Sequence, residues 1–200
     1  MRKLLIATHN PGKIREYQTL LADLPLTVTS LKAEGITEDV KETGATFAEN
    51  ACLKAESYAR MTGLWTWADD SGLEVDALDR RPGVYSARYA GPGATDQERY
   101  QKLLQELHQR PDAPRTARFR CVVALAIPGE QTATVEGTVE GLITNQPSGA
   151  NGFGYDPVFL LPDRGVTMAE LPAEVKNEIS HRGQAAQKAK QLLLERLANT

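Results

Sequence analysis

Patterns typical of strands and helices alternate in the first part of this chain, and no other feature limits its fold as strongly. The strand patterns cover residues 4–7, 26–31, 64–68, 117–127 and 132–144, and the helical patterns among them cover 14–24 and 46–63. The last two strand patterns are joined by a turn at Pro128 and Gly129. Alternation favours parallel neighbours, whereas a hairpin is antiparallel. We therefore expect an α/β protein with a mixed sheet.

Capping signals predict where several helices begin and end. Thr46 with Glu49, and Thr95 with Glu98, have the spacing of a capping box, so a helix is expected after each threonine. Gly63 stands where a helix commonly ends. Further strands are expected at 73–78 and 158–161, and further helices over 95–109 and over 183–197 after an N-cap at Ser180.

Length and composition narrow the class of protein. The 200 residues suffice for a sizeable core and contain no linker or repeat, so we expect a single domain over 1–200. The net charge of -3 argues against a broad nucleic-acid-binding face, though not against a nucleotide ligand. No apolar stretch could span a membrane, and the run 4–7 is too short for a signal peptide. Cys52 and Cys121 have no disulfide or metal spacing, so a cytoplasmic protein is expected.

A polar loop, Thr8-His9-Asn10-Pro11-Gly12-Lys13, joins the first strand to the first helix. Such a loop directs backbone N–H groups and a helix N-terminus at one point, which suits phosphate oxygens. Thr8 and Asn10 add side-chain donors, and Lys13 adds a positive charge. The spacing of glycine and lysine differs from that of a Walker A loop. The alternative is an ordinary strand–helix connection with a solvated lysine.

Two carboxylates, Asp69 and Asp70, follow the strand pattern at 64–68 and precede Ser71 and Gly72. Ligands of α/β sheets usually bind beyond strand ends, and carboxylate oxygens suit Mg²⁺. One carboxylate can hold the metal while its neighbour orients or deprotonates a water. The pattern therefore predicts a magnesium site for hydrolysis, and a solvated acidic turn is the alternative.

Two later segments suit a base and an anion. Residues 149–157 combine three glycines with Phe153 and Tyr155, whose rings offer aromatic faces for a base. Lys176, followed by Ser-His-Arg-Gly at 180–183, makes a cationic cluster near a helix start. The alternatives are aromatic rings that fill the core and a solvated helix cap.

Together and in this order, these segments resemble the inosine triphosphate pyrophosphatase family, the non-canonical purine NTP pyrophosphatases. The likeness covers nearly the whole chain and is carried by residues 7–13, 42–44, 46–51, 68–73, 82–89, 152–157 and 180–183. Each segment is short, but the combination is specific. The resemblance implies an elongated mixed sheet flanked by helices, two lobes around a central cleft, and a homodimer.

The resemblance also implies roles for individual residues. Asp70 is the implied proton acceptor for the attacking water. The implied Mg²⁺ site consists of Glu42, Asp69 and Asp70. The implied substrate-binding residues are Thr8, His9, Asn10, Pro11, Gly12, Lys13, Lys54, Ser71, Phe153, Gly154, Tyr155, Asp156, Lys176, His181 and Arg182. Within this set, the lysines at 13 and 54 belong to the triphosphate and residues 153–156 to the base and sugar, while Lys176, His181 and Arg182 close around the base.

The implied reaction is hydrolysis of ITP, dITP and XTP to the monophosphate and pyrophosphate, which keeps deaminated purines out of DNA and RNA. The expected partner is thus a small-molecule nucleotide, with no nucleic acid and no membrane. Two alternatives stay open. A Maf-type nucleotide pyrophosphatase would prefer other bases, and a nucleotide-binding regulator would show no turnover.

Overall fold

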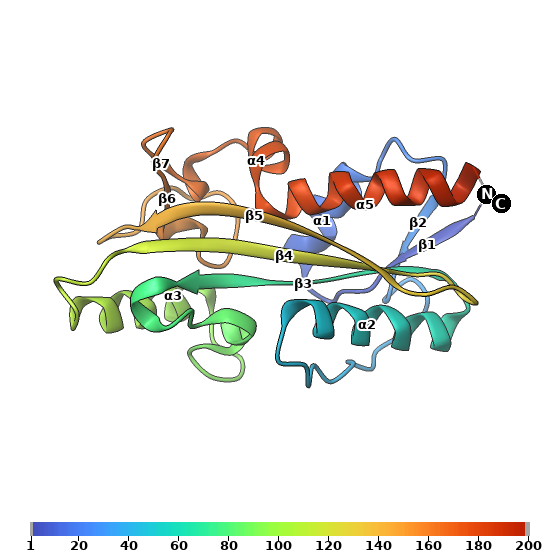
Figure 1. Cartoon of the computed structure of the whole chain (residues 1–200), viewed down its shortest axis with the longest axis horizontal. Coiled ribbons are helices and arrows are strands. Elements are labelled where there is room, and N and C mark those ends of the chain that lie inside the picture. Colours follow the sequence, from blue (N-terminus) through green and yellow to red (C-terminus); the bar gives the residue numbers. More distant parts are fainter. Residues whose placement is uncertain (1, 199–200) are drawn as a thin grey trace. The chain divides into compact units, whose positions relative to one another are not determined.

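In the computed structural model, which describes residues 2–198, the strands form one seven-stranded sheet in the order β2-β1-β3-β4-β5-β6-β7. They are β1 (Lys3–Ile6), β2 (Thr27–Ser30), β3 (Trp65–Val75), β4 (Thr116–Ala126), β5 (Ala133–Ile143), β6 (Phe159–Leu161) and β7 (Val166–Thr167) (Figure 1). β1 is parallel to both β2 and β3, while the β5–β6 and β6–β7 pairs are antiparallel. The predicted α/β fold with a mixed sheet is confirmed.

Local capping chemistry sets the helix ends. The helices are α1 (Pro11–Leu20), α2 (Phe47–Thr62), α3 (Asp96–His108), α4 (Ala173–Ile179) and α5 (His181–Ala198). Both predicted capping boxes are present, before α2 and before α3. Gly63 ends α2 in the left-handed conformation that favours glycine, with φ at 68°. Across the described residues, no helix has the length and apolarity needed to cross a membrane.

The length of β3 differs from the prediction. The sequence predicted two strands, 64–68 and 73–78, on either side of an acidic turn, but β3 runs unbroken from Trp65 to Val75. Asp69 and Asp70 therefore lie inside a strand, and they are only 1% and 6% exposed. A buried strand can contain ionised side chains where each finds a charged or hydrogen-bonding partner, and both aspartates do.

The chain divides into two compact units, each with its own hydrophobic core. Among the described residues, unit 1 comprises 2–70, 121–137 and 182–198, and unit 2 comprises 71–120 and 138–181. The core of unit 1 gathers around Trp67, which meets the ring of Tyr17 edge-on at 5.3 Å. The core of unit 2 gathers around Phe119 and Phe159, whose ring centroids are 4.4 Å apart. The single domain and the cleft expected from the sequence stay predictions.

Different helices cover the two faces of the strands in unit 1. Trp65 and Trp67 of β3 share a core cluster with residues of α1 and α5, and in the described chain that cluster includes no residue of α2. In Figure 1, α2 lies on the opposite side of these strands from α1 and α5. Successive strand residues point to opposite faces. Neighbouring side chains of β3 therefore meet different helices.

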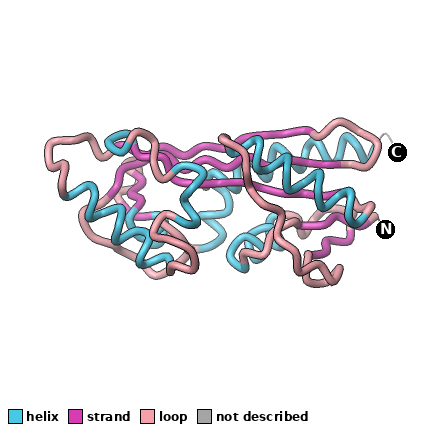
Figure 2. The backbone as a smooth tube through the Cα atoms, turned by 90° about the horizontal axis from the view of Figure 1, so that it is seen from below, coloured by secondary structure: helices cyan, strands magenta, loops and turns pink. Residues whose placement is uncertain are grey.

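A long loop between β2 and α2 covers residues 31–46 (Figure 2). Tyr58 of α2 holds it, because its hydroxyl donates to the carbonyl oxygen of Glu38 at 2.9 Å and accepts from the N–H of Val40 at 3.2 Å. This anchoring brings Glu42 of the loop to α2, where it meets Lys54.

Candidate active site

Asn10 caps the N-terminus of α1. Its Oδ1 accepts the backbone N–H of Gly12 at 2.8 Å and that of Lys13 at 3.2 Å. Pro11 has no N–H to offer. The sequence predicted that these backbone N–H groups bind phosphate, but the side chain of Asn10 already accepts their hydrogen bonds. Anion binding by this loop would depend on side chains, chiefly the ammonium of Lys13.

Asp69 points toward α1 and α5. Its Oδ2 lies 2.8 Å from Nζ of Lys13 and 3.7 Å from Nε of Arg182. The thiol of Cys121 donates to the same oxygen at 3.7 Å. Burial raises the pKa of the carboxyl, but the charges of Lys13 and Arg182 outweigh it and hold the pKa of Asp69 well below its usual value. Asp69 is therefore an ionised group held between two cations.

Asp70 points toward α2. Its Oδ2 accepts from Nδ2 of Asn50 at 3.1 Å, and its Oδ1 lies 3.5 Å from Nζ of Lys54. Burial raises the pKa of Asp70, and the charges of Lys54 and Lys13 offset this only in part, so the pKa stays above its ordinary value. A raised pKa makes a carboxylate a stronger proton acceptor, which suits general-base chemistry.

Glu42 and Asp70 converge on one cation, since Nζ of Lys54 also lies 2.5 Å from Oε1 of Glu42. Carboxylate oxygens around a position that already attracts a positive charge fit a divalent metal ion. Among residues 2–198, however, no three His, Cys, Asp or Glu side chains gather closely enough to hold a metal. The structure brings Glu42 and Asp70 together but places Asp69 on the other face of β3.

The Phe153–Asp156 segment lies in unit 2 and is organised by one carboxylate. Oδ2 of Asp156 accepts from Nζ of Lys176 at 2.5 Å and from the N–H of Phe153 at 2.9 Å. The same ammonium stands 4.7 Å over the ring of Phe153. Gly152 has φ at 74°, and a Cβ there would collide with the Asp156 carboxylate. These contacts fix the loop while leaving the ring of Phe153 half-buried.

Tyr155, by contrast, belongs to the core of unit 2. It is 4% exposed, and its hydroxyl donates to the carbonyl oxygen of Ser86 at 2.9 Å. The alternative reading of the aromatic residues, that they fill the core, therefore fits Tyr155 better than Phe153.

Three contributing residues were missed by the sequence analysis. Asn50 donates to Asp70 and accepts from the N–H of Gly44. Asp96 accepts the N–H of Gly154 at 2.7 Å. The third residue, Glu16, binds the guanidinium of Arg182 at 2.7 Å. Asn50 lies within the segment 46–51 that carries the family resemblance, which was an available signal. Asp96 and Glu16 act through partners distant in sequence, so no local pattern marks them.

Comparison with known proteins decides the family. A model of the Ham1 family matches residues 4–192. This chain belongs to the Ham1 family. It is 52% identical to a dITP/XTP pyrophosphatase of Bacillus subtilis over 96% of this chain and 98% of that protein. It is 55% identical to a dITP/XTP pyrophosphatase of Geobacillus kaustophilus, over 94% and 92% of the two chains.

The fold of a Ham1 protein agrees as well. The structure of a HAM1 protein from Coxiella burnetii superposes with a TM-score of 0.90 at 45% identity, covering 98% of this chain and all of that one. The resemblance inferred from the sequence is thereby confirmed. Enzymes of the Ham1 family generally depend on a divalent metal.

The remaining predicted site residues of this Ham1 chain fall into different surroundings. His181 begins α5 in unit 2 and stacks on Phe119, with ring centroids 4.7 Å apart. Arg182 belongs to unit 1 and is 2% exposed, with Glu16 and Asp69 as its acidic partners. Arg182 thus contacts the buried carboxylate of Asp69 and the partly buried one of Glu16, and its predicted place at the base stays a prediction.

Two predicted residues lie nearer the surface. Nε2 of His9 is 3.4 Å from Oδ1 of the exposed Asp39. Ser71 follows Asp70 in β3 and is half-buried.

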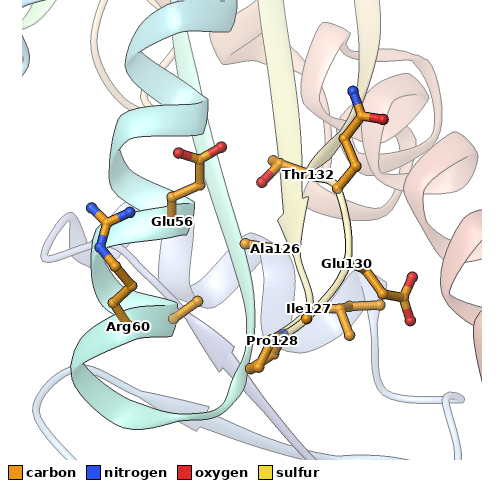
Figure 3. A pocket seen from close by; sticks show the side chains of 10 residues that line it. Glu56, Arg60, Ala126, Ile127, Pro128, Glu130 and Thr132 are labelled. Carbon is orange, nitrogen blue, oxygen red and sulfur yellow. The ribbon is translucent and has the colours of Figure 1, made fainter.

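A separate hollow of about 470 Å³ lies in unit 1 between α2 and the β4–β5 turn (Figure 3). Its lining mixes Glu56, Arg60 and Glu130 with Ala126, Ile127 and Pro128, and includes none of the predicted site residues. Charges of both signs around an apolar floor favour no one ligand, so this hollow plays no part in the proposed chemistry.

Proposed function

We propose that this Ham1-family protein hydrolyses the triphosphates of deaminated purines, dITP, ITP and XTP, to the monophosphate and pyrophosphate. The observation that carries this proposal is Asp70, a buried carboxylate with a raised pKa that lies beside the ammonium of Lys54. The names of the relatives, dITP/XTP pyrophosphatases, support the base preference. Such an activity would clear the nucleotide pool before deaminated purines enter DNA or RNA.

Asp70 is the proposed proton acceptor. It would take a proton from a water whose oxygen bonds to the α-phosphorus, and the bond to the pyrophosphate leaving group would break. Positioned bases of this kind typically contribute about 10²–10⁴-fold to the rate. Lys13 and Lys54 would offset the negative charge that develops on the departing pyrophosphate.

Glu42 and Asp70 are the proposed ligands of Mg²⁺, because their carboxylates already converge on a cation. When bound, Mg²⁺ neutralises phosphate charge and polarises the phosphoryl oxygens. Asp69 was also predicted to hold this ion, but its contacts with Lys13 and Arg182 on the opposite face of β3 support a different role.

Base and sugar binding is proposed for Phe153–Asp156 with Lys176 and His181. The half-buried ring of Phe153 offers a face for stacking. Inosine and xanthosine carry a carbonyl at position six where adenine carries an amino group. A donor aimed at that carbonyl would leave adenine mispaired, and polar sites of this kind can reject the wrong partner by about 10⁴-fold or more.

The assay that tests this function follows turnover of all common and deaminated triphosphates with Mg²⁺, and resolves the products. We expect deoxyinosine monophosphate and pyrophosphate from dITP in one step, with loss of activity in excess chelator and recovery on adding Mg²⁺. Accumulation of a diphosphate and free phosphate would contradict the proposal. A preference for pyrimidine or methylated substrates would favour the Maf-type alternative.

We further propose a cytoplasmic homodimer that acts on a free nucleotide and needs neither nucleic acid nor membrane. Light scattering on the purified protein tests the dimer, which a monomer mass at micromolar concentration would contradict.

A further inference from the structure

Asp69 and Asp70 are adjacent in sequence, but within residues 2–198 their side chains make their close contacts with different partners. Asp70 hydrogen bonds to Asn50 and faces Lys54, both of α2, whereas Asp69 pairs with Lys13 of α1 and Arg182 of α5. Strand geometry explains this, because consecutive side chains of β3 leave opposite faces of the sheet. Two carboxylates arranged in this way do not converge on one ion.

Asp69 belongs to a group of four charged side chains from β3, α1 and α5. Asp69 and Glu16 face the cations Lys13 and Arg182, and the two arginine contacts bring Arg182 between the carboxylates. The side chain of Asp69 is fully buried, and that of Arg182 is 3% exposed. Two members are partly exposed: the cation Lys13, with 13% of its side chain exposed, and the carboxylate Glu16, with 14%. Of the two cations in this set, Lys13 is therefore the one that an anionic ligand can reach.

We propose that Asp69 is a positioning residue that fixes the ammonium of Lys13 for the triphosphate and does not hold the metal. This inference rests on the proposed function, which makes Lys13 a phosphate contact. A lysine side chain has a flexible stem and loses considerable rotamer freedom when it is held in one place. The buried carboxylate of Asp69, 2.8 Å from Nζ, restricts the side chain of Lys13 in the free protein. The rotamer entropy is therefore lost before the substrate binds, and the cation is already in place.

A double-mutant cycle tests the coupling between the two residues. The four proteins are wild type, Asp69→Asn, Lys13→Met and the double variant, each assayed for kcat and KM with dITP. We expect Asp69→Asn to lower kcat/KM about 10- to 100-fold, the range for losing a hydrogen bond to a charged group. In the Lys13→Met background the same change should cost little further, because its effect passes through Lys13. Additive losses would overturn the proposal.

Metal binding without nucleotide gives an independent readout, with Asp70→Asn as the matched control on the same strand. Titration with Mn²⁺, followed by its electron paramagnetic resonance signal, should give Asp69→Asn an affinity within about twofold of wild type and Asp70→Asn a clear loss. Oδ1 of Asp69 is buried and has no hydrogen-bond partner in the described chain, so it is the atom through which Asp69 would reach a metal. Equal loss of Mn²⁺ in both variants would make Asp69 a ligand and overturn the proposal.

Asp69→Glu covers the case in which Asp69→Asn does not fold. It keeps the charge beside Arg182 but lengthens the side chain by one methylene group, so the ammonium of Lys13 should be displaced and kcat/KM should fall in the same Lys13-dependent way. Wild-type kcat/KM in folded Asp69→Glu would contradict positioning. If wild type turns over a different nucleotide, the proposed function fails, and the same cycle run on that nucleotide still decides the role of Asp69.

Discussion

The two units hold their buried charges in different ways. In unit 1, the carboxylates of Asp69 and Asp70 stand on a strand, and the lysines that meet them come from α1 and α2. In unit 2, Glu74 of β3 pairs with Arg120 of β4, but the predicted base-binding loop depends on Asp156, which holds Lys176 and the loop backbone. Regular elements fix side chains more rigidly than loops do, which favours chemistry in unit 1. A loop whose shape depends on a few hydrogen bonds suits recognition of a base.

The largest effect is expected from a substitution that removes the proposed proton acceptor of unit 1. Asp70→Asn keeps the shape of the side chain and its contact with Asn50, but it removes the charge that accepts a proton. Turnover of dITP should fall by at least about 10²-fold, with kcat carrying most of the loss. Steady-state kinetics on a protein whose circular dichroism matches wild type measures this. Near-normal kcat would show that Asp70 is not the proton acceptor.

A smaller effect is expected from the carboxylate of unit 2. Asp156→Asn removes the negative charge that pairs with the buried Lys176 and loosens the loop that presents Phe153. We expect kcat/KM for dITP to fall about 10- to 100-fold, mainly through KM. The matched control is Asp76→Asn in the same unit, where the carboxylate pairs with Arg118 at 2.9 Å and is about one-third exposed. If Asp156→Asn lowered kcat alone, Asp156 would act on the chemical step, and the proposed division between chemistry in unit 1 and base recognition in unit 2 would be wrong.

The smallest effect is expected from the loss of one hydrogen bond to the backbone of the loop in unit 2. Asp96→Ala removes the acceptor for the N–H of Gly154, so the loop should be held less tightly and KM for dITP should rise about 2- to 10-fold. Asp96→Asn keeps an oxygen acceptor and should restore most of the affinity. If both variants raise KM equally, the carboxylate charge rather than the hydrogen bond matters there.

Local chemistry was readable from the sequence wherever the deciding partner lies within one helical turn. The capping boxes at Thr46 and Thr95 and the glycine that ends α2 follow from spacing alone. Asn10 followed by Pro11 is also a common start of a helix, and that signal would have placed the start of α1 at Pro11 rather than near Ile14.

Long-range partners explain what the sequence could not show. Whether β3 stops or continues at Asp69 depends on cations from α1 and α5, and Arg182 lies more than one hundred residues further along the chain. The family resemblance named Lys13, Lys54 and Asp70, and their site roles stay predictions. It could not reveal that Asp69 and Asp70 face different helices. α4 and β7 are short elements without a clear periodic pattern, so neither was predicted.

The unbroken run of β3 also bears on which changes in chain length this protein can tolerate. Since the face reached by each aspartate is set by the parity of its position, inserting one residue after Trp67 would exchange the two carboxylates between the helices. The anchor for Lys13 would then face α2, and the proton acceptor would face α1. Added residues in the loop 31–46 would leave that parity untouched. Asp69 and Asp70 are chemically identical, and the alternation of side chains along β3 is what gives them different surroundings.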